Sequence, residues 1–184
     1  DVPEAPKAFF CDVLVAGASV GGVAAALRAA DLVAIHGLLS EGFADLPEEV
    51  PVGLIAFDDR ARWLSLPGSD RGQVLDDLTL IETAGSYTVL FDALYLAAQD
   101  LESGGVVLVV SDGRDENSAV RIQDIEGLCA RNQVRLVTLG VGQRVDERAL
   151  RRLALLTRGR HLGRRGRPLL LLQAEALARE LLHL

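Results

Sequence analysis

The stretch from Cys11 to Gly22 constrains the fold of this chain more than any other. The apolar run at 12–16 breaks into the small residues Gly17-Ala18-Ser19 and then continues into an alanine-rich segment. This pattern predicts a strand, a tight turn and the start of a helix. Such a junction places backbone N–H groups and small side chains where a ligand can approach.

The rest of the chain alternates short apolar runs with segments of helical periodicity. We expect strands at 12–16, 52–57, 62–66, 105–110, 134–141 and 160–162, and helices at 22–46, 71–81, 89–101, 120–131, 146–157 and 169–184. Asp70 is the expected cap of the helix at 71–81, and Asn117 or Ser118 is the expected cap of the helix at 120–131. The short turn between strands 52–57 and 62–66 predicts a hairpin.

These elements predict an α/β fold. We expect a doubly wound, mostly parallel central sheet with one antiparallel edge strand and helices on both faces, in a Rossmann-like arrangement. Residues 1–10 are expected to form an N-terminal arm, and residues 11–184 a single domain that closes with the helix at about 169–184. A chain of 184 residues that is 49% apolar can bury a sizeable core without disulfides or structural metals.

Composition argues against several classes of function. The net charge of −7 argues against a generic nucleic-acid binder, although nine arginines lie between Arg144 and Arg167. Those arginines indicate either a solvated helix face and loop or an anionic partner surface. No uninterrupted apolar run approaches the roughly 20 residues that cross a bilayer. Cys11 and Cys129 lack the spacing of a zinc site, so we expect buried free thiols, with one bridge as the alternative.

Two enzymatic chemistries compete for the stretch from Cys11 to Gly22. Gly17, Ser19 and Gly22 nearly match a dinucleotide fingerprint and imply a flavin- or nicotinamide-binding oxidoreductase fragment. Ser19 stands where that fingerprint needs its middle glycine, and no acidic residue ends a second strand about 20 residues later. Gly17-x-Ser19-x-Gly21 also matches a nucleophile elbow, but no histidine follows in a position that a hydrolase would use.

Four later segments support a third interpretation. The segments at 52–61, 85–94, 106–118 and 137–142 resemble, in order and spacing, the von Willebrand factor type A domain, above all its bacterial branch. The strand that ends in Ser111-Asp112-Gly113 is the most specific part of this resemblance, which covers about residues 11–163. The resemblance implies a protein-binding domain with a metal-ion-dependent adhesion site at the carboxyl ends of its strands.

The metal ligands carry over only in part. The resemblance assigns Ser19, Thr88 and Asp112 to the site. Gly17 occupies the position of the expected aspartate, and Gly21 that of the expected second serine. Mg²⁺ prefers six oxygen ligands in octahedral geometry. With one matched carboxylate we expect weak or absent binding of Mg²⁺ or another divalent cation, and no other cofactor.

We therefore expect a non-enzymatic module that binds another protein or another domain of the same chain. The candidate contacts are Ser19, Thr88 and Asp112, together with Asp115 beside them and Trp63 on the edge hairpin. The competing hypothesis moves recognition to the region from Arg144 to Arg167 or to the Trp63 edge. The chain begins at Asp1 without Met, so a signal or a preceding domain is compatible with it, and the resemblance favours an extracytoplasmic or secreted location.

Overall fold

A computed structural model describes residues 12–17 (as backbone), 36–37, 40, 48–81, 87–101, 104–141 and 145–162 of the chain. The strands are β1 (Asp12–Gly17), β2 (Val52–Phe57), β3 (Ala61–Ser65), β4 (Gly105–Ser111), β5 (Val134–Gly140) and β6 (Arg160–Leu162). The helices are α2 (Arg71–Thr79), α3 (Leu90–Asp100), α4 (Ile122–Asn132) and α5 (Glu147–Leu156). The N-terminal arm, most of the helix expected at 22–46 and the closing helix expected at 169–184 lie outside the described residues.

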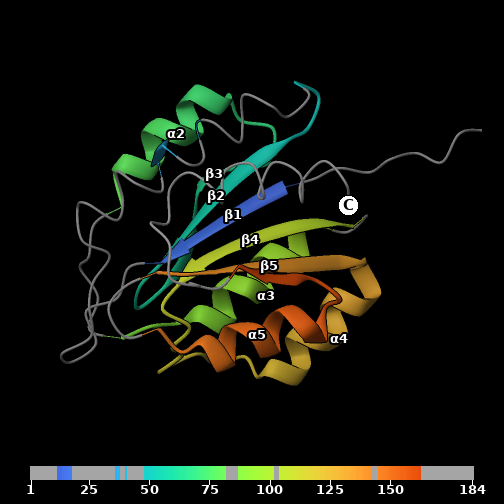
Figure 1. Cartoon of the computed structure of the whole chain (residues 1–184). Coiled ribbons are helices and arrows are strands. Elements are labelled where there is room, and N and C mark those ends of the chain that lie inside the picture. The colour runs from blue at the N-terminus through green and yellow to red at the C-terminus, as the bar shows by residue number, and fades with distance from the viewer. Residues whose placement is uncertain are drawn as a thin grey trace, which may run out of the picture.

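The six strands form one sheet in the order β3-β2-β1-β4-β5-β6 (Figure 1). All neighbouring pairs are parallel except β2 and β3, which pair antiparallel at one edge. The expected α/β fold with one antiparallel edge strand is therefore confirmed. β1 lies in the middle, where Asp12 to Ala16 pair with β2 on one side and with Val106 to Val110 of β4 on the other.

Alternate residues of the strands pack on opposite faces of the sheet, as the two-residue period of a strand requires. On β4, Val106, Leu108 and Val110 join the core that includes α2, while Val107 and Val109 join the core that includes α3 and α4. Figure 1 shows α2 on one side of the sheet and α3, α4 and α5 on the other. Because both faces are covered, every residue of β2 is buried.

Helices begin where local hydrogen bonds satisfy their first N–H groups. The Asp70 carboxylate accepts a hydrogen bond from the Gln73 N–H (3.1 Å), as expected, and Asp146 caps α5 in the same way through Ala149 (2.9 Å). The cap expected for α4 is wrong. That helix begins at Ile122, with Arg121 as its N-cap residue.

The hairpin of β2 and β3 is held by a close approach of its two strands. Gly53 of β2 lies beneath the Trp63 ring, and a Cβ at Gly53 would come within 2.9 Å of that ring and 2.8 Å of the Pro67 nitrogen. The Trp63 indole N–H donates to the carboxylate of Asp100 at the end of α3 (2.7 Å). Trp63 is thus half-buried and fastens the edge hairpin to α3.

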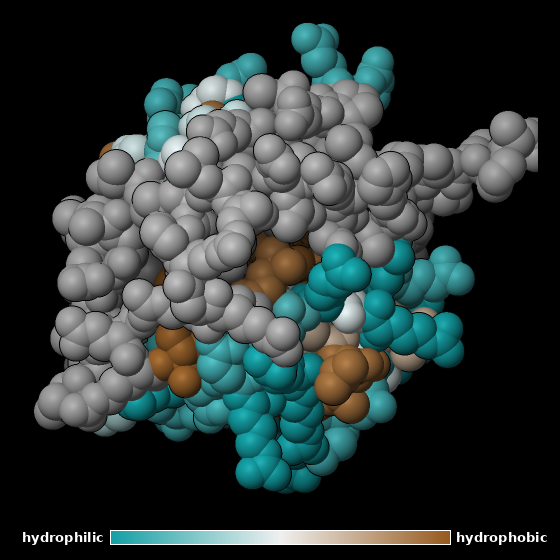
Figure 2. All heavy atoms as spheres, viewed as in Figure 1, coloured by the Kyte–Doolittle hydropathy of each residue, from teal (hydrophilic) through white to brown (hydrophobic). Residues whose placement is uncertain are grey.

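On the face seen in Figure 2, the described surface is mostly hydrophilic, with separate hydrophobic areas. In the part of the chain that the structure describes, the large apolar side chains that stay exposed are Leu66, Leu80, Tyr87 and Leu155. None of the described helices is long and apolar enough to span a bilayer.

Candidate functional site

The candidate site lies where the order of the strands reverses in the sheet, between β1 and β4. β1 has β2 on one side and β4 on the other, so the strand order reverses at β1. Ligands of open α/β sheets bind at the carboxyl ends of the strands at such a point. Gly17 ends β1, and Asp112 follows the last residue of β4. We call the edge of the sheet where the parallel strands end the site edge.

Asp112 is held by its own turn and by α5. Its carboxylate accepts a hydrogen bond from the Arg114 N–H (3.0 Å), and the Arg114 Nε lies 3.8 Å from its other oxygen. The Asp112 carbonyl accepts from the Asp146 N–H at the start of α5 (2.7 Å). Burial raises the pKa of Asp112 above its ordinary value, against the lowering effect of Arg114. The carboxylate at the site edge is therefore partly desolvated and already has a cation beside it.

Thr88 is the second matched residue that the structure describes, and it lies next to the loop that carries Asp112. Its carbonyl accepts hydrogen bonds from the backbone N–H groups of Glu116 (2.9 Å) and Asn117 (3.1 Å). Thr88 is only 3% exposed. The backbone of Thr88 is thus hydrogen-bonded to the loop that follows Asp112, at the site edge.

The same loop caps α3 from a distance in sequence. α3 has no side-chain cap of its own at Val89. Instead the Asp115 carboxylate accepts from the Phe91 N–H (3.0 Å), and the Ser118 hydroxyl accepts from the Asp92 N–H (3.1 Å). The Ser118 hydroxyl also donates to Asp115 (2.5 Å).

In return, the Asp92 carboxylate accepts from the Val120 N–H (2.9 Å). Asp92 therefore fastens the loop to the start of α3. Asp115 is not a freely solvated turn residue but a structural link between the loop and α3. The role of Ser118 was not predicted, because its hydrogen-bond partner lies 26 residues away.

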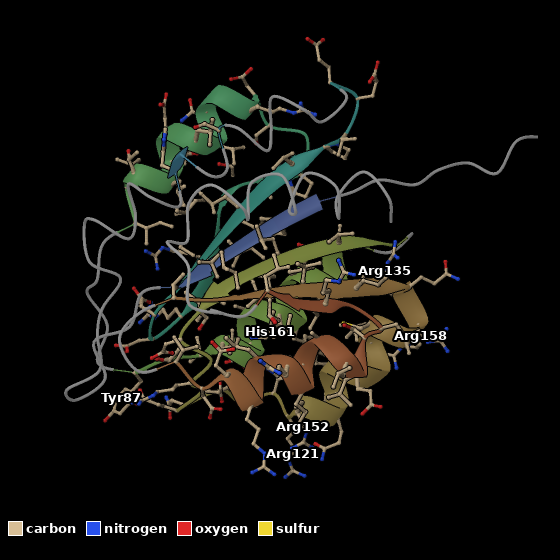
Figure 3. The ribbon with its side chains drawn as sticks, in the orientation of Figure 1. Tyr87, Arg121, Arg135, Arg152, Arg158 and His161 are labelled. Carbon is tan, nitrogen blue, oxygen red and sulfur yellow. The ribbon has the colours of Figure 1, made fainter. Side chains whose placement is uncertain are left out.

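Tyr87 is a functional candidate that the sequence analysis did not single out. It precedes Thr88, its side chain is exposed to 53%, and it lies at the end of the molecule where the parallel strands end (Figure 3). Its N–H donates to the carboxylate of Asp59 in the turn between β2 and β3 (2.6 Å). An exposed aromatic ring on a fixed backbone is a frequent anchor in protein interfaces. A single tyrosine in a loop gives no sequence signal that separates this position from a buried one.

Of the remaining candidates, Trp63 does not join this group. Ser19 and Gly21 lie outside the described residues. Trp63 contacts Asp100 at the end of α3, whereas Thr88 lies just before its beginning, so about 15 Å of helix separates the two regions.

The residues that the structure describes do not fit a full divalent-metal site. Gly17 has no side-chain donor, and the Arg114 guanidinium lies beside the carboxylate of Asp112. The described residues contain no group of three or more His, Cys, Asp or Glu side chains that could hold a metal ion. A cation that prefers six oxygen ligands would find one carboxylate and the Thr88 hydroxyl among the matched positions described.

A buried polar chain elsewhere in the fold has the residue types of a catalytic triad. The Thr138 hydroxyl lies 2.8 Å from His161 Nδ1, and His161 Nε2 contacts the Glu147 carboxylate. Thr138 is fully buried in β5 and also bonds to the Leu150 carbonyl (3.2 Å). Because Thr138 is fully buried, a substrate has no access to its hydroxyl. The role of the three polar side chains is therefore structural, and they join α5 to β5 and β6.

Comparison with known proteins agrees with this arrangement. The von Willebrand factor type A domain matches residues 29–164. No curated protein sequence matches the chain. Among solved structures, BatB from Bacteroides thetaiotaomicron is 16% identical with a TM-score of 0.72, over 95% of this chain and 98% of that one. An aerotolerance-related membrane protein from Bacteroides fragilis is 15% identical with a TM-score of 0.71, over 95% and 100%.

Manganese-loaded TRAP protein from Plasmodium vivax is 18% identical with a TM-score of 0.65, over 92% of this chain and 71% of that one. At such identities the structural likeness concerns the fold alone, whereas the family match extends over most of the sequence. Nothing among these matches supports the oxidoreductase alternative. With its sheet order, its site edge and this match in agreement, the chain belongs to the von Willebrand factor type A domain family.

Proposed function

We propose that this domain binds another protein, or another domain of its own chain, through the loops around Ser19, Thr88 and Asp112, and that it catalyses no reaction. Domains of this family generally act as interaction modules. The observation that carries the proposal is the exposed Tyr87 ring beside buried Thr88, on loops that hydrogen bonds hold in place. A fixed loop loses little conformational freedom when a partner docks.

The proposed contact works without a divalent ion or with one that binds weakly. A metal-dependent site would use a carboxylate at the end of β1, where this chain has Gly17. Arg114 supplies a positive charge to Asp112 from within the same turn. We propose that the Arg114 guanidinium and backbone N–H groups replace the cation as the groups that a partner's acceptor atoms meet.

We also propose an extracytoplasmic location. One protein of similar fold is described as a membrane protein related to aerotolerance. This supports a setting at the cell envelope.

Partner capture with matched surface variants tests the interaction. Wild-type domain, Tyr87→Ala and Leu66→Ala are immobilised, exposed to a lysate of the encoding organism in Mg²⁺ or in EDTA, and the bound proteins are quantified by mass spectrometry. Leu66 is an equally exposed apolar residue that follows β3 at the opposite edge of the sheet.

We expect a protein that wild type and Leu66→Ala retain equally in Mg²⁺ and in EDTA, and that Tyr87→Ala loses at least about tenfold, since a central interface aromatic contributes on the order of 2 kcal/mol. Equal capture by Tyr87→Ala would place the contact elsewhere. Loss of capture in EDTA would show that a metal ion is needed.

A further inference from the structure

We propose that the exposed side of α5 is a second docking surface, which takes an acidic segment of a partner protein. We call it the arginine face and define it by Arg148, Arg151, Arg152, Leu155 and Arg158. It is separate from the loops at the site edge, although α5 begins there at the Asp146 cap. Figure 3 shows Arg152 on the side of α5 that faces away from the sheet, and Arg158 beyond the carboxyl end of the helix.

The helical period places these residues on one side of α5. At 3.6 residues per turn, Arg148, Arg151, Arg152 and Leu155 fall within about 100° of arc, with Leu155 near the middle. The opposite side packs on the sheet through Leu150, Leu153 and Ala154, which are buried. Leu155 is 76% exposed, so the centre of the arginine face is an uncovered apolar side chain.

The guanidinium groups of this face lack ionic partners among the described residues. The ion pairs that the structure describes join Arg62 with Asp58, Arg114 with Asp112, and His161 with Glu147. Glu147, the acidic residue in the first turn of α5, is therefore already engaged by His161. Unpaired like charges on one side of a helix repel one another, and an anionic partner relieves that repulsion.

Charge and shape on this face are complementary to an acidic segment. The chain as a whole has a net charge of −7, so the arginine face is a local reversal of sign. An open hollow of about 800 Å³ lies against α5. Its lining includes Glu147 at the start of the helix, which His161 engages, together with Arg148, Arg151, Arg152, Leu155 and Leu156. An apolar side chain can occupy the leucine-lined part while carboxylates on either side accept from the guanidinium groups.

The backbone at Arg158 allows a substitution that separates charge from folding. Arg158 has φ of +57°, in the left-handed region that favours glycine. Its N–H donates to the Leu155 carbonyl and the Gly159 N–H to the Ala154 carbonyl, which is the usual closing pattern of a helix. Glycine would be the more stable residue at 158, so the position retains a guanidinium at a conformational cost. Arg158→Gly therefore removes the guanidinium without a loss of stability.

Carboxylates fit this surface better than lipid or nucleic acid. The planar guanidinium forms two parallel hydrogen bonds with one carboxylate. Membrane-surface helices expose a broad apolar side, whereas α5 exposes Leu155 as its one large hydrophobic residue. The aromatic residues that stack on bases are missing from α5.

Fluorescence anisotropy with a labelled 20-residue helical peptide tests the proposal. The peptide carries glutamates on both sides of a leucine stripe, and its comparison peptide has glutamine in place of each glutamate. The variants on the arginine face are Arg151→Gln/Arg152→Gln and Arg158→Gly. Arg60→Gln/Arg131→Gln removes the same charge from exposed positions elsewhere. Gln133→Gly makes the glycine replacement at the other described non-glycine residue of positive φ, at the end of α4.

We expect Arg151→Gln/Arg152→Gln to raise the Kd for the acidic peptide about tenfold, because two charge-assisted hydrogen-bond donors are lost. We expect the Kd values of the two controls, Arg60→Gln/Arg131→Gln and Gln133→Gly, to stay within twofold of the wild-type Kd. The glutamine peptide does not bind. Arg158→Gly weakens binding about threefold while its melting temperature is no lower than that of wild type, which separates binding from folding.

Several results would overturn the proposal. The first is that the acidic peptide binds Arg151→Gln/Arg152→Gln as tightly as it binds wild type. The same holds if the peptide does not bind wild type at millimolar concentration. The second is that wild type binds phosphatidylserine vesicles but not the peptide, which would assign the arginine face to a membrane. A third is self-association in sedimentation that Arg151→Gln/Arg152→Gln abolishes while the peptide does not bind, which would assign the face to a second copy of the chain.

Discussion

Asp115 shows how a single side chain connects the site to the fold. Its carboxylate satisfies the Phe91 N–H in the first turn of α3 and holds the Ser118 hydroxyl, so the loop after β4 and the helix that follows Thr88 are fastened to each other. An unsatisfied N–H at a helix start costs free energy when the group is kept from water. The neighbouring Glu116 side chain is exposed and contributes only its backbone N–H.

Replacing Asp115 by Ala should lower the free energy of unfolding by about 1–2 kcal/mol, the usual effect of losing a helix cap. Urea unfolding followed by circular dichroism at pH 7 measures it. Glu116→Ala removes the same formal charge one residue later and should cost less than about 0.5 kcal/mol. Equal effects of the two substitutions would mean that charge, and not the cap, determines stability here.

At the scale of elements, the edge hairpin of β2 and β3 depends on a glycine. Gly53 allows the Trp63 ring and the backbone at Leu66 and Pro67 to approach β2 closely. The Trp63 indole then reaches Asp100 and joins the hairpin to α3. The atoms around Gly53 include backbone atoms, which cannot rotate away from an added methyl group as the end of a flexible side chain can.

Gly53→Ala should therefore destabilise the domain by about 1–3 kcal/mol, the usual cost of overpacking. Gly127→Ala is the matched change within α4, where the nearest atom to an added Cβ is the end of the Arg131 side chain at 3.7 Å. It should raise stability by up to about 1 kcal/mol, since alanine favours helix more than glycine does. Thermal and urea unfolding of both variants measure the difference, and a Gly53→Ala variant as stable as wild type would refute the close packing.

At the scale of the whole molecule, the sheet order places Gly17 and Asp112 at the ends of adjacent strands. A ligand that binds only the folded state stabilises it by RT ln(1 + [L]/Kd), about 4 kcal/mol when its concentration is a thousand times Kd. For a domain of this size that corresponds to a rise in melting temperature of about 8–16 °C. The melting temperature of the whole domain is thus a sensitive measure of metal binding.

We expect the melting temperature in 5 mM MgCl₂ and in EDTA to agree within about 2 °C, because the matched positions that the structure describes supply too few oxygen ligands. Differential scanning calorimetry of the wild-type chain measures both. Sodium chloride at equal ionic strength is the control for general salt effects. A magnesium-specific rise of about 8 °C or more, lost in Asp112→Ala, would establish a functional metal site.

The sequence by itself determined the order of the described elements, the antiparallel hairpin and the Asp70 cap. These features depend on periodicity and on hydrogen bonds that span a few residues, so a local stretch contains all the information they need. The expected cap of α4 failed because Ser118 bonds to α3, and competing tertiary hydrogen bonds are invisible in a local pattern.

Only the tertiary structure decided which groups meet. Arg114 turned toward Asp112, Asp115 capped a helix 24 residues earlier, and Trp63 packed over Gly53 and bonded to Asp100. Likewise, the sequence showed that arginines cluster near α5 but not that four of them surround an exposed leucine. Periodicity reports which side of an element is buried, whereas the partner of each side chain depends on how elements distant in sequence pack together.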